Sequence, residues 1–346
     1  MEVSSVEKIF SILSSRHEKI LKISNALKRL NFECKLFYAD TFADCHSYLQ
    51  KKLDNVLQHK LSADYLKKLS AQAKQEIAEY NPNKILFINS PLPEDTVQEI
   101  VSDGKPCYFY YVDPVEDVEK FKSKKSNCYI GLYDINSYKK LSSAGIKNVK
   151  FLPLGYNCDY ENVPKMAKDI DIFWVGTPNK ARLKILSAIA KKAKADGWIF
   201  QCYSPFWGWQ YFWKKWIFQV KYPELYRCAV NQELVSKEVA EKYSRSCICL
   251  NIHNANIDSF NPRTYEILAS GGFLLTDERK EYDGLVPGED FACYSSVEDM
   301  IEKIEYYLNH NEEREQMVAR GKTKIFGKRT VSESVRQLFE MCCDKH

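Results

Sequence analysis

Residues 252–276 read IHNANIDSFNPRTYEILASGGFLLT, and this stretch predicts a strand–helix–strand unit. Asn261 is a favoured N-cap residue, and Pro262 occupies the first helical position, where its missing N–H is tolerated. The pair Gly271-Gly272 ends the helix. Apolar runs flank it at Ile248–Ile252 and Phe273–Thr276. Two apolar strands joined by a helix are typical of a parallel sheet, which indicates an α/β fold.

The start of this helix is a candidate anion site. Its first turn presents backbone N–H groups and the positive end of the helix dipole. Arg263 adds a cation with bidentate geometry for phosphate, and Glu266 lies about one turn further along, where a carboxylate can accept the hydroxyls of a ribose. An ordinary capped helix with an exposed arginine and a solvated glutamate explains the same pattern equally well. From the residues alone, both interpretations stay open.

Strands and helices alternate along the whole chain. In the first half we expect strands at Lys8–Leu13, Glu33–Tyr38, Lys84–Asn89, Cys107–Val112, Cys128–Tyr133 and Val149–Leu152. The charged stretch Ala43–Glu79 is predicted as one long helical region. In the second half we expect strands at Asp171–Val175, Trp198–Cys202, Ile248–Ile252 and Phe273–Thr276. The alternation predicts two doubly wound α/β domains, each with a parallel sheet covered on both faces.

The join between these domains is expected near Gly155–Lys168, where Pro164 and polar residues dominate. We therefore expect an N-terminal domain over residues 1–156, a second domain over 157–328 and a final helical segment over 329–346. In open α/β sheets, ligands bind beyond the carboxyl ends of the strands. Two such crevices facing each other would form one cleft.

Composition and charge exclude several classes of protein. The 346 residues include 50 Lys and Arg against 46 Asp and Glu, a formal net charge of +4, so no nucleic-acid partner is expected. The twelve cysteines show neither zinc-ligand nor redox spacing. The opening MEVSSVEKIF has no signal-peptide pattern, and Trp198–Val220 is too polar to span a membrane. We expect reduced thiols and a cytoplasmic protein.

The segment Tyr203–Phe218 is unusually rich in aromatic residues and also contains Lys214 and Lys215. Three interpretations fit it. The rings can form an aromatic core, they can stack on a sugar or a base, or Trp207–Phe218 can make a peripheral contact with the inner face of a membrane. A lipid-linked substrate would suit the third interpretation.

Four segments together resemble the group 1 glycosyltransferases, and among these the branch of spore-maturation, CgeB-like proteins. NPRTYEILASGGFLLTDE at 261–278 is similar to the C-terminal signature of that family. KFLPLGYN at 150–157 looks like the close of its N-terminal domain, and DIDIFWVGTPNKARLKIL at 169–186 like the opening of its nucleotide domain. FACYSSVEDMIEKIEYYLNHNEEREQMVARG at 291–321 matches its two helices. The likeness is good from about residue 128 to 340 and weak before that.

The resemblance implies a GT-B fold, in which two Rossmann-like domains face a central cleft and the last helix returns to the first domain. It also implies a nucleotide-diphosphate sugar as donor, bound by the second domain. The residues expected to bind this donor are Gly176, Arg182, Asn261, Arg263, Thr264 and Glu266. No metal and no other cofactor are expected, because the helix dipole and the arginines neutralise the leaving diphosphate.

The catalytic candidates rest partly on the resemblance and partly on position. Many retaining members carry two glutamates with seven residues between them, and here Asp258 takes the first place relative to Glu266. Retention is favoured on this basis, with the leaving phosphate as the acceptor of the proton. An inverting enzyme would need a base, either Asp113 or His17, although a turn and a helix cap explain those two residues equally well. His253 follows a strand and is expected near the donor sugar, against the alternative of a surface histidine.

The resulting prediction is a glycosyltransferase that moves a sugar to a hydroxyl of a glycan or lipid-linked acceptor. Two alternatives stay open. One is a nucleotide-sugar epimerase of the same fold, which binds the donor but needs no second substrate. The other is a non-catalytic, membrane-docked protein that binds a sugar or a nucleotide.

Overall fold

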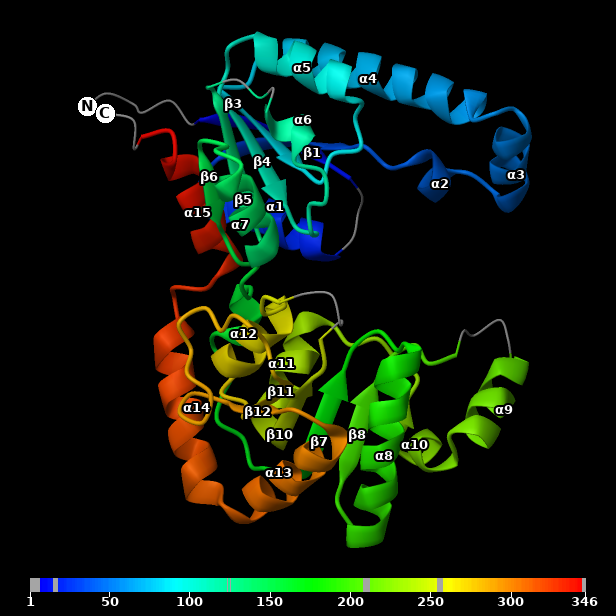
Figure 1. Ribbon diagram of the computed structural model, residues 1–346, viewed down its shortest axis with the longest axis vertical. Helices are drawn as coiled ribbons and strands as arrows, with labels where there is room; N and C mark the ends of the chain where they lie inside the picture. The colour runs from blue at the N-terminus through cyan, green and yellow to red at the C-terminus, as the bar shows by residue number, and fades with distance from the viewer. Residues whose placement is uncertain are drawn as a thin grey trace. The chain divides into compact units, whose positions relative to one another are not determined.

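The computed structural model describes residues 7–14, 18–122, 124, 126–207, 212–253 and 258–343. The chain divides into two compact units, each an α/β body around its own sheet (Figure 1). Unit 1 comprises Met1–Leu154 and Val331–His346, and unit 2 comprises Gly155–Thr330. The chain therefore passes between the units twice, after residues 154 and 330, where the sequence suggested divisions after 156 and 328.

Unit 1 contains a six-stranded parallel sheet in the order β2-β1-β3-β4-β5-β6. Its strands are β1 (Lys8–Leu13), β2 (Glu33–Tyr38), β3 (Lys84–Ile88), β4 (Cys107–Tyr111), β5 (Cys128–Leu132) and β6 (Val149–Phe151). Each lies where the sequence predicts a strand. The central strands are buried on both faces, which explains why they are nearly continuous apolar runs.

Helices cover both faces of this sheet. They are α1 (Glu18–Arg29), α2 (Phe42–Cys45), α3 (Tyr48–Val56), α4 (Lys60–Tyr80), α5 (Glu94–Ser102), α6 (Glu119–Lys122), α7 (Ile135–Ser143) and α15 (Val331–Glu340). On one face α15 packs against α1 and against β4 and β5, with Phe339 edge-on to Tyr108. On the other face α4 and α5 cover a core in which Phe87 and Phe109 stack with ring centroids 4.6 Å apart.

The prediction of one long helical region over Ala43–Glu79 is wrong, because the chain breaks it into three helices. Ser47 caps α3, and its hydroxyl accepts from the Gln50 backbone N–H. Between α3 and α4, His59 adopts the left-handed conformation with φ of 64°. The buried carboxylate of Asp54 accepts from the Ser62 backbone N–H at 3.0 Å and fixes this turn. Hydrophobic periodicity gave no sign of these local caps.

Unit 2 contains a second six-stranded parallel sheet, in the order β12-β11-β10-β7-β8-β9. Its strands are β7 (Ile170–Val175), β8 (Phe200–Tyr203), β9 (Ala229–Val230), β10 (Ser246–Asn251), β11 (Leu274–Asp277) and β12 (Ala292–Tyr294). Its helices are η1 (Cys158–Tyr160, a 3₁₀ turn), α8 (Lys180–Asp196), α9 (Phe212–Lys221), α10 (Pro223–Cys228), α11 (Ser236–Arg245), α12 (Pro262–Ala269), α13 (Val297–Asn309) and α14 (Asn311–Ile325). The two parallel sheets confirm the predicted fold class.

The two connecting segments lie side by side within unit 2. The Tyr156 backbone N–H donates to the Arg329 carbonyl at 3.0 Å, and the Gly327 N–H donates to the Tyr156 hydroxyl at 2.8 Å. Gly155 lies so close to Arg329 that a Cβ there would be 1.8 Å from the Arg329 carbonyl oxygen. Only glycine allows these two backbones to approach in this way.

We expect Gly155→Ala to destabilise unit 2 by about 3 kcal/mol or more, because backbone atoms cannot move aside as a flexible side chain can. Denaturant unfolding followed by tryptophan fluorescence measures this directly, since all six tryptophans lie in unit 2. Gly197→Ala is the control. Its Cβ would meet no atom within 4 Å, so only the strain of a φ of +77° is added, about 1 kcal/mol. Equal effects of the two substitutions would contradict this account of Gly155.

Candidate functional site

Most of the residues expected to bind a ligand in unit 2 gather at the carboxyl ends of β7 and β10. Gly176 directly follows β7, and Asn179 caps α8 by accepting from the Arg182 backbone N–H at 2.9 Å. Beyond β10 the chain leads into α12, which begins with Pro262 at its first position. The carboxyl edge of a parallel sheet is where open α/β folds bind ligands.

A pair of asparagines fixes the start of α12. Asn251 ends β10, and its side-chain amide exchanges two hydrogen bonds of 3.1 Å with the amide of Asn261. Asn251 also donates to the hydroxyl of the fully buried Thr264 at 3.0 Å. Asn261 is the N-cap residue by position, but its side chain bonds to Asn251 and not to the helix. The Thr264 backbone N–H donates to the Asn261 carbonyl at 3.1 Å, and the N–H of Arg263 has no intrahelical acceptor because it lies in the first turn.

His253 joins this network with both ring nitrogens. Its Nε2 accepts from the Asn261 backbone N–H at 3.2 Å, so the proton lies on Nδ1, which donates to Asp277 at 2.8 Å. The His253 backbone N–H donates to the same carboxylate at 3.0 Å. Burial lowers the pKa of His253 below its usual 6.5, although Asp277 opposes that change. The ring is therefore neutral near pH 7 and holds the start of α12 in place.

Asp277 ends β11 and is ionised. Its burial raises the pKa of the carboxyl, but the contacts with His253 and the neighbouring Arg279 outweigh burial and hold the pKa below its usual value. Asp277 directly follows the predicted strand Phe273–Thr276, a position typical of ligand-site residues, whereas the sequence indicated no role for Asn251. Polar residues at the ends of two apolar strands were the signal that could have identified both.

Two arginines bring positive charge to the same edge. The guanidinium of Arg182 donates to the Ile252 carbonyl through Nη2 at 2.6 Å and to the Thr177 carbonyl through Nη1 at 2.9 Å. It ties the segments after β7 and β10 together. Burial lowers the pKa of Arg182, and the nearby charge of Arg263 lowers it further.

Arg263 differs from Arg182 in what its guanidinium contacts. A Cβ at Gly176 would lie 3.2 Å from Nη1 of Arg263, so the two residues are neighbours. The guanidinium of Arg263 lies beside the hydroxyl of the buried Tyr243, and the two side chains act on each other's pKa as hydrogen-bond partners. Burial opposes the charge of Arg263, but Tyr243 and the buried Glu266 raise its pKa above the usual value. The sequence gave no sign that Tyr243 belongs here.

The remaining catalytic candidates are Asp258, Asp113 and His17. Asp258 forms an ion pair with Lys280 at 3.0 Å. Asp113 belongs to unit 1, where its exposed carboxylate accepts from the Asn89 side chain at 2.6 Å. His17 falls outside the described residues, as does the segment 254–257 that follows His253.

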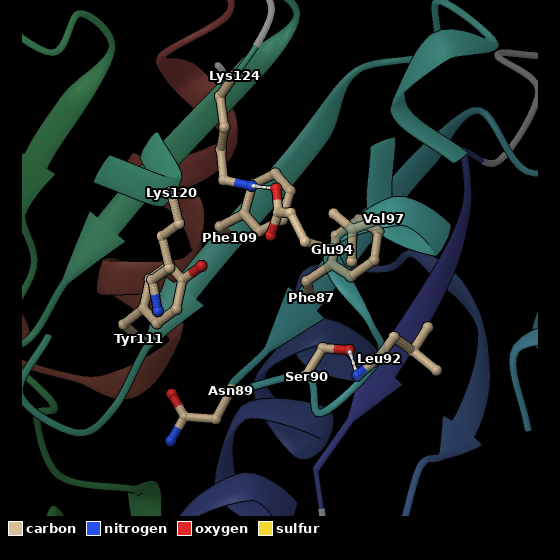
Figure 2. Close-up of a pocket in the computed structure, with 10 residues that line it drawn as sticks. All are labelled: Phe87, Asn89, Ser90, Leu92, Glu94, Val97, Phe109, Tyr111, Lys120 and Lys124. Atoms are coloured by element: carbon tan, nitrogen blue, oxygen red, sulfur yellow. Dashed lines mark hydrogen bonds and ion pairs between the residues drawn. The ribbon is translucent and has the colours of Figure 1, made fainter. Parts of the chain in front are cut away.

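Unit 1 has a cavity of about 240 Å³ at the end of β3 and β4, shown in Figure 2. The rings of Phe87, Phe109 and Tyr111 form part of its wall. Lys124 lies over the Phe109 ring, 4.3 Å from its centroid, and its Nζ is 3.3 Å from a carboxylate oxygen of Glu94. Asn89 also lines the cavity, which places its partner Asp113 beside it.

The aromatic segment divides into two parts. Phe206 and Trp207 pack with Phe218, at ring-centroid distances of 5.3 and 5.4 Å, in the core of unit 2. Trp213 and Trp216 are exposed. Residues 208–211 lie outside the described part of the chain. Among the described helices, none is long and apolar enough to cross a membrane, and the described residues contain no group of three or more His, Cys, Asp or Glu placed to hold a metal ion.

We expect the pH dependence of the stability of unit 2 to depend on His253. Its pKa is lower in the folded protein than in the unfolded chain, so its contribution is fully present above pH 6.5 and is lost as the pH falls below that value. His253→Gln should therefore remove a slope of up to about 1.4 kcal/mol per pH unit in the free energy of unfolding below pH 6.5. The measurement is denaturant unfolding by tryptophan fluorescence at pH 7.5 and 5.5. Exposed His310→Gln serves as the control, and an unchanged slope in His253→Gln would contradict the assignment.

Comparisons with known proteins find a family similar to the second half of the chain. Residues 182–340 match the family described as Glycosyl transferase-like. The spore protein CgeB of Bacillus subtilis (strain 168) is 22% identical over 305 residues, which cover 82% of this chain and 90% of that protein.

Solved structures show the same architecture at low identity. A glycosyltransferase from Rickettsia africae ESF-5 superposes with a TM-score of 0.68 at 12% identity, covering 98% of each chain. The Anabaena protein HepE, solved with UDP-glucose, also gives 0.68 at 12% identity, covering 97% of this chain and 99% of that one. The chain shares the GT-B fold of these structures, and its residues 182–340 are similar to the glycosyl transferase-like family.

Proposed function

We propose that this protein transfers a sugar from a nucleoside diphosphate donor to an acceptor hydroxyl. The observation that carries the proposal is the position of Arg263, whose guanidinium stays charged at the carboxyl edge of the sheet, next to Gly176 and near Arg182. Two neighbouring guanidinium groups at such an edge favour an anionic ligand. HepE, of the same fold, was solved with UDP-glucose, which supports a nucleotide-sugar donor here as well.

In this proposal the diphosphate binds at the start of α12. The Arg263 backbone N–H and guanidinium donate to its oxygens, and the helix dipole adds favourable potential. Arg182 contributes mainly its charge, because the carbonyls of Thr177 and Ile252 already accept three of its five N–H groups. Gly176 leaves room for the phosphates beside Arg263. Glu266, one turn further along α12, accepts the hydroxyls of the ribose.

The chemical step places negative charge on the leaving diphosphate as the bond to the sugar breaks. Preorganised cations lower the energy of that state, so we propose a reaction that needs no metal. We favour retention, in which the leaving phosphate takes the acceptor proton and no separate base is required. His253 is not this base, since both of its ring nitrogens are engaged. For inversion the described candidate is Asp113 in unit 1.

We further propose that unit 1 binds the acceptor, a glycan or a lipid-linked glycan, at the cavity beside Asp113. Its aromatic wall suits the apolar face of a sugar ring, and Lys120 and Lys124 suit an anionic group. An epimerase of the same fold would need no such site. Incubation with the donor alone separates the two, because an epimerase converts the sugar without any acceptor.

We expect Arg263→Gln to weaken binding of the preferred nucleoside diphosphate by about ten- to a hundredfold, the loss of one or two hydrogen bonds to a charged group. A thermal-shift panel of UDP, GDP, CDP, ADP and dTDP without metal first identifies the preferred base, and calorimetry then measures the dissociation constant. The control is Arg227→Gln, since the side chain of Arg227 is 65% exposed and belongs to α10, not to the segments after β7 and β10. Equal affinity of Arg263→Gln and the unmodified protein would remove the basis of the proposal.

We expect Glu266 to recognise the ribose, and a double comparison isolates that contact. The unmodified protein should bind the preferred ribonucleoside diphosphate more tightly than its 2′-deoxy form, by about five- to tenfold for one hydrogen bond. Glu266→Gln should weaken ribonucleotide binding and shrink that difference. If the variant keeps the full preference for ribose, Glu266 does not contact the sugar. Its melting temperature without nucleotide checks that the buried substitution is tolerated.

A further inference from the structure

Helix α9 presents an apolar stripe to solvent. Trp213, Trp216, Ile217 and Val220 are 47%, 67%, 46% and 62% exposed. Their spacing of three, four and seven residues places them on one side of the helix. Phe218 lies on the other side, is 7% exposed and packs on Phe206 and Trp207. The helix is thus held to unit 2 through Phe218, and its larger apolar face is left exposed.

The charges on α9 are all of one sign. Lys214, Lys215 and Lys221 are exposed, and residues 212–221 contain no acidic side chain. Lys214 and Lys221 flank the stripe on one side, whereas Lys215 lies on the side of Phe218, with its Nζ 6.0 Å from the centroid of the Tyr226 ring. An apolar stripe with tryptophan and flanking lysines is the pattern of a helix that lies in the interface of a bilayer, with rings among the acyl chains and lysines at the headgroups.

Helix α3 of unit 1 has the same construction. Its exposed apolar residues are Tyr48, Leu49, Leu53 and Val56, at 69%, 75%, 50% and 77%, followed by Leu57 at 38%. Lys51 and Lys52 are exposed beside them. The only acid of this helix, Asp54, is buried and occupied by the turn to α4. In Figure 1, α3 and the start of α4 extend beyond the sheet of unit 1.

We propose that the protein docks on an anionic lipid surface through α9 and α3, one such helix in each unit. The apolar stripes alone would suit any apolar partner. The exclusively basic exposed charge on both helices selects a surface that is itself negative, and anionic headgroups supply it. Sequence reasoning reached α9 through one of its three interpretations of the aromatic segment. This docking is independent of the proposed transfer reaction.

Vesicle cosedimentation of the full chain, without nucleotide, tests the proposal. We expect binding to vesicles of phosphatidylcholine with phosphatidylglycerol, weaker binding to phosphatidylcholine alone, and release at high salt. Lys214→Gln with Lys221→Gln should lower the partition coefficient about 25-fold, since each lysine near an anionic surface contributes about fivefold. Trp216→Gln with Val220→Gln, and separately Leu49→Gln with Val56→Gln, should each lower it at least tenfold.

Matched controls use apolar residues that are equally exposed but lie outside both helices. Ile199 and Val235 are 53% and 66% exposed, so Ile199→Thr with Val235→Ser should leave vesicle binding unchanged. Unfolding followed by far-UV circular dichroism confirms that each variant is folded, since unit 1 contains no tryptophan. Binding of the α9 and α3 variants at the level of the unmodified protein would overturn the proposal, as would equal binding to neutral and anionic vesicles. A dimer in light scattering that the α9 variant dissociates, with no vesicle binding, would overturn it in favour of self-association.

Discussion

The hydrogen bond from the Asn261 backbone N–H to Nε2 of His253 fixes the point at which α12 begins. It exists only while the imidazole is neutral and carries its proton on Nδ1, and the carboxylate of Asp277 enforces that tautomer. Hydrogen bonds thus join Asp277 at the end of β11, His253 after β10 and Asn261, the N-cap residue of α12. Arg263 lies two residues further on, so its place at the edge of the sheet follows from these bonds. The reciprocal amide pair of Asn251 and Asn261 holds the same corner from the other side.

The two arginines at this edge perform different physical tasks. Arg182 gives its N–H groups to the carbonyls of Thr177 and Ile252 and so builds the floor of the site. Arg263 lies next to Gly176 and the Tyr243 hydroxyl at the edge of the sheet, and we assign it the contact with the anion. Placing two guanidinium groups near each other is unfavourable, as the lowered pKa of Arg182 shows. A bound diphosphate would relieve that repulsion, which is why we place it there.

Long apolar strands were predictable because burial on both faces of a parallel sheet leaves a continuous apolar run. All six strands of unit 1 and four of unit 2 were found this way, whereas β9 (Ala229–Val230) and β12 (Ala292–Tyr294) are too short to show such a run. The break between α3 and α4 depends on a cap, a left-handed residue and the buried Asp54, which periodicity does not record. In the site, chain position predicted the cluster at the ends of β7 and β10. It did not predict which way each side chain turns, so Asn261 was expected to cap α12, whereas its side chain bonds to Asn251.

A crystal structure of the protein with its preferred nucleoside diphosphate tests the central claim most directly. The account predicts the terminal phosphate within hydrogen-bond distance of the Arg263 backbone N–H and guanidinium, with the ribose hydroxyls on Glu266. His253 should keep its bonds to Asp277 and Asn261, because it holds the helix and does not contact the phosphate. A nucleotide bound away from the start of α12, for instance in the cavity of unit 1, would contradict the account.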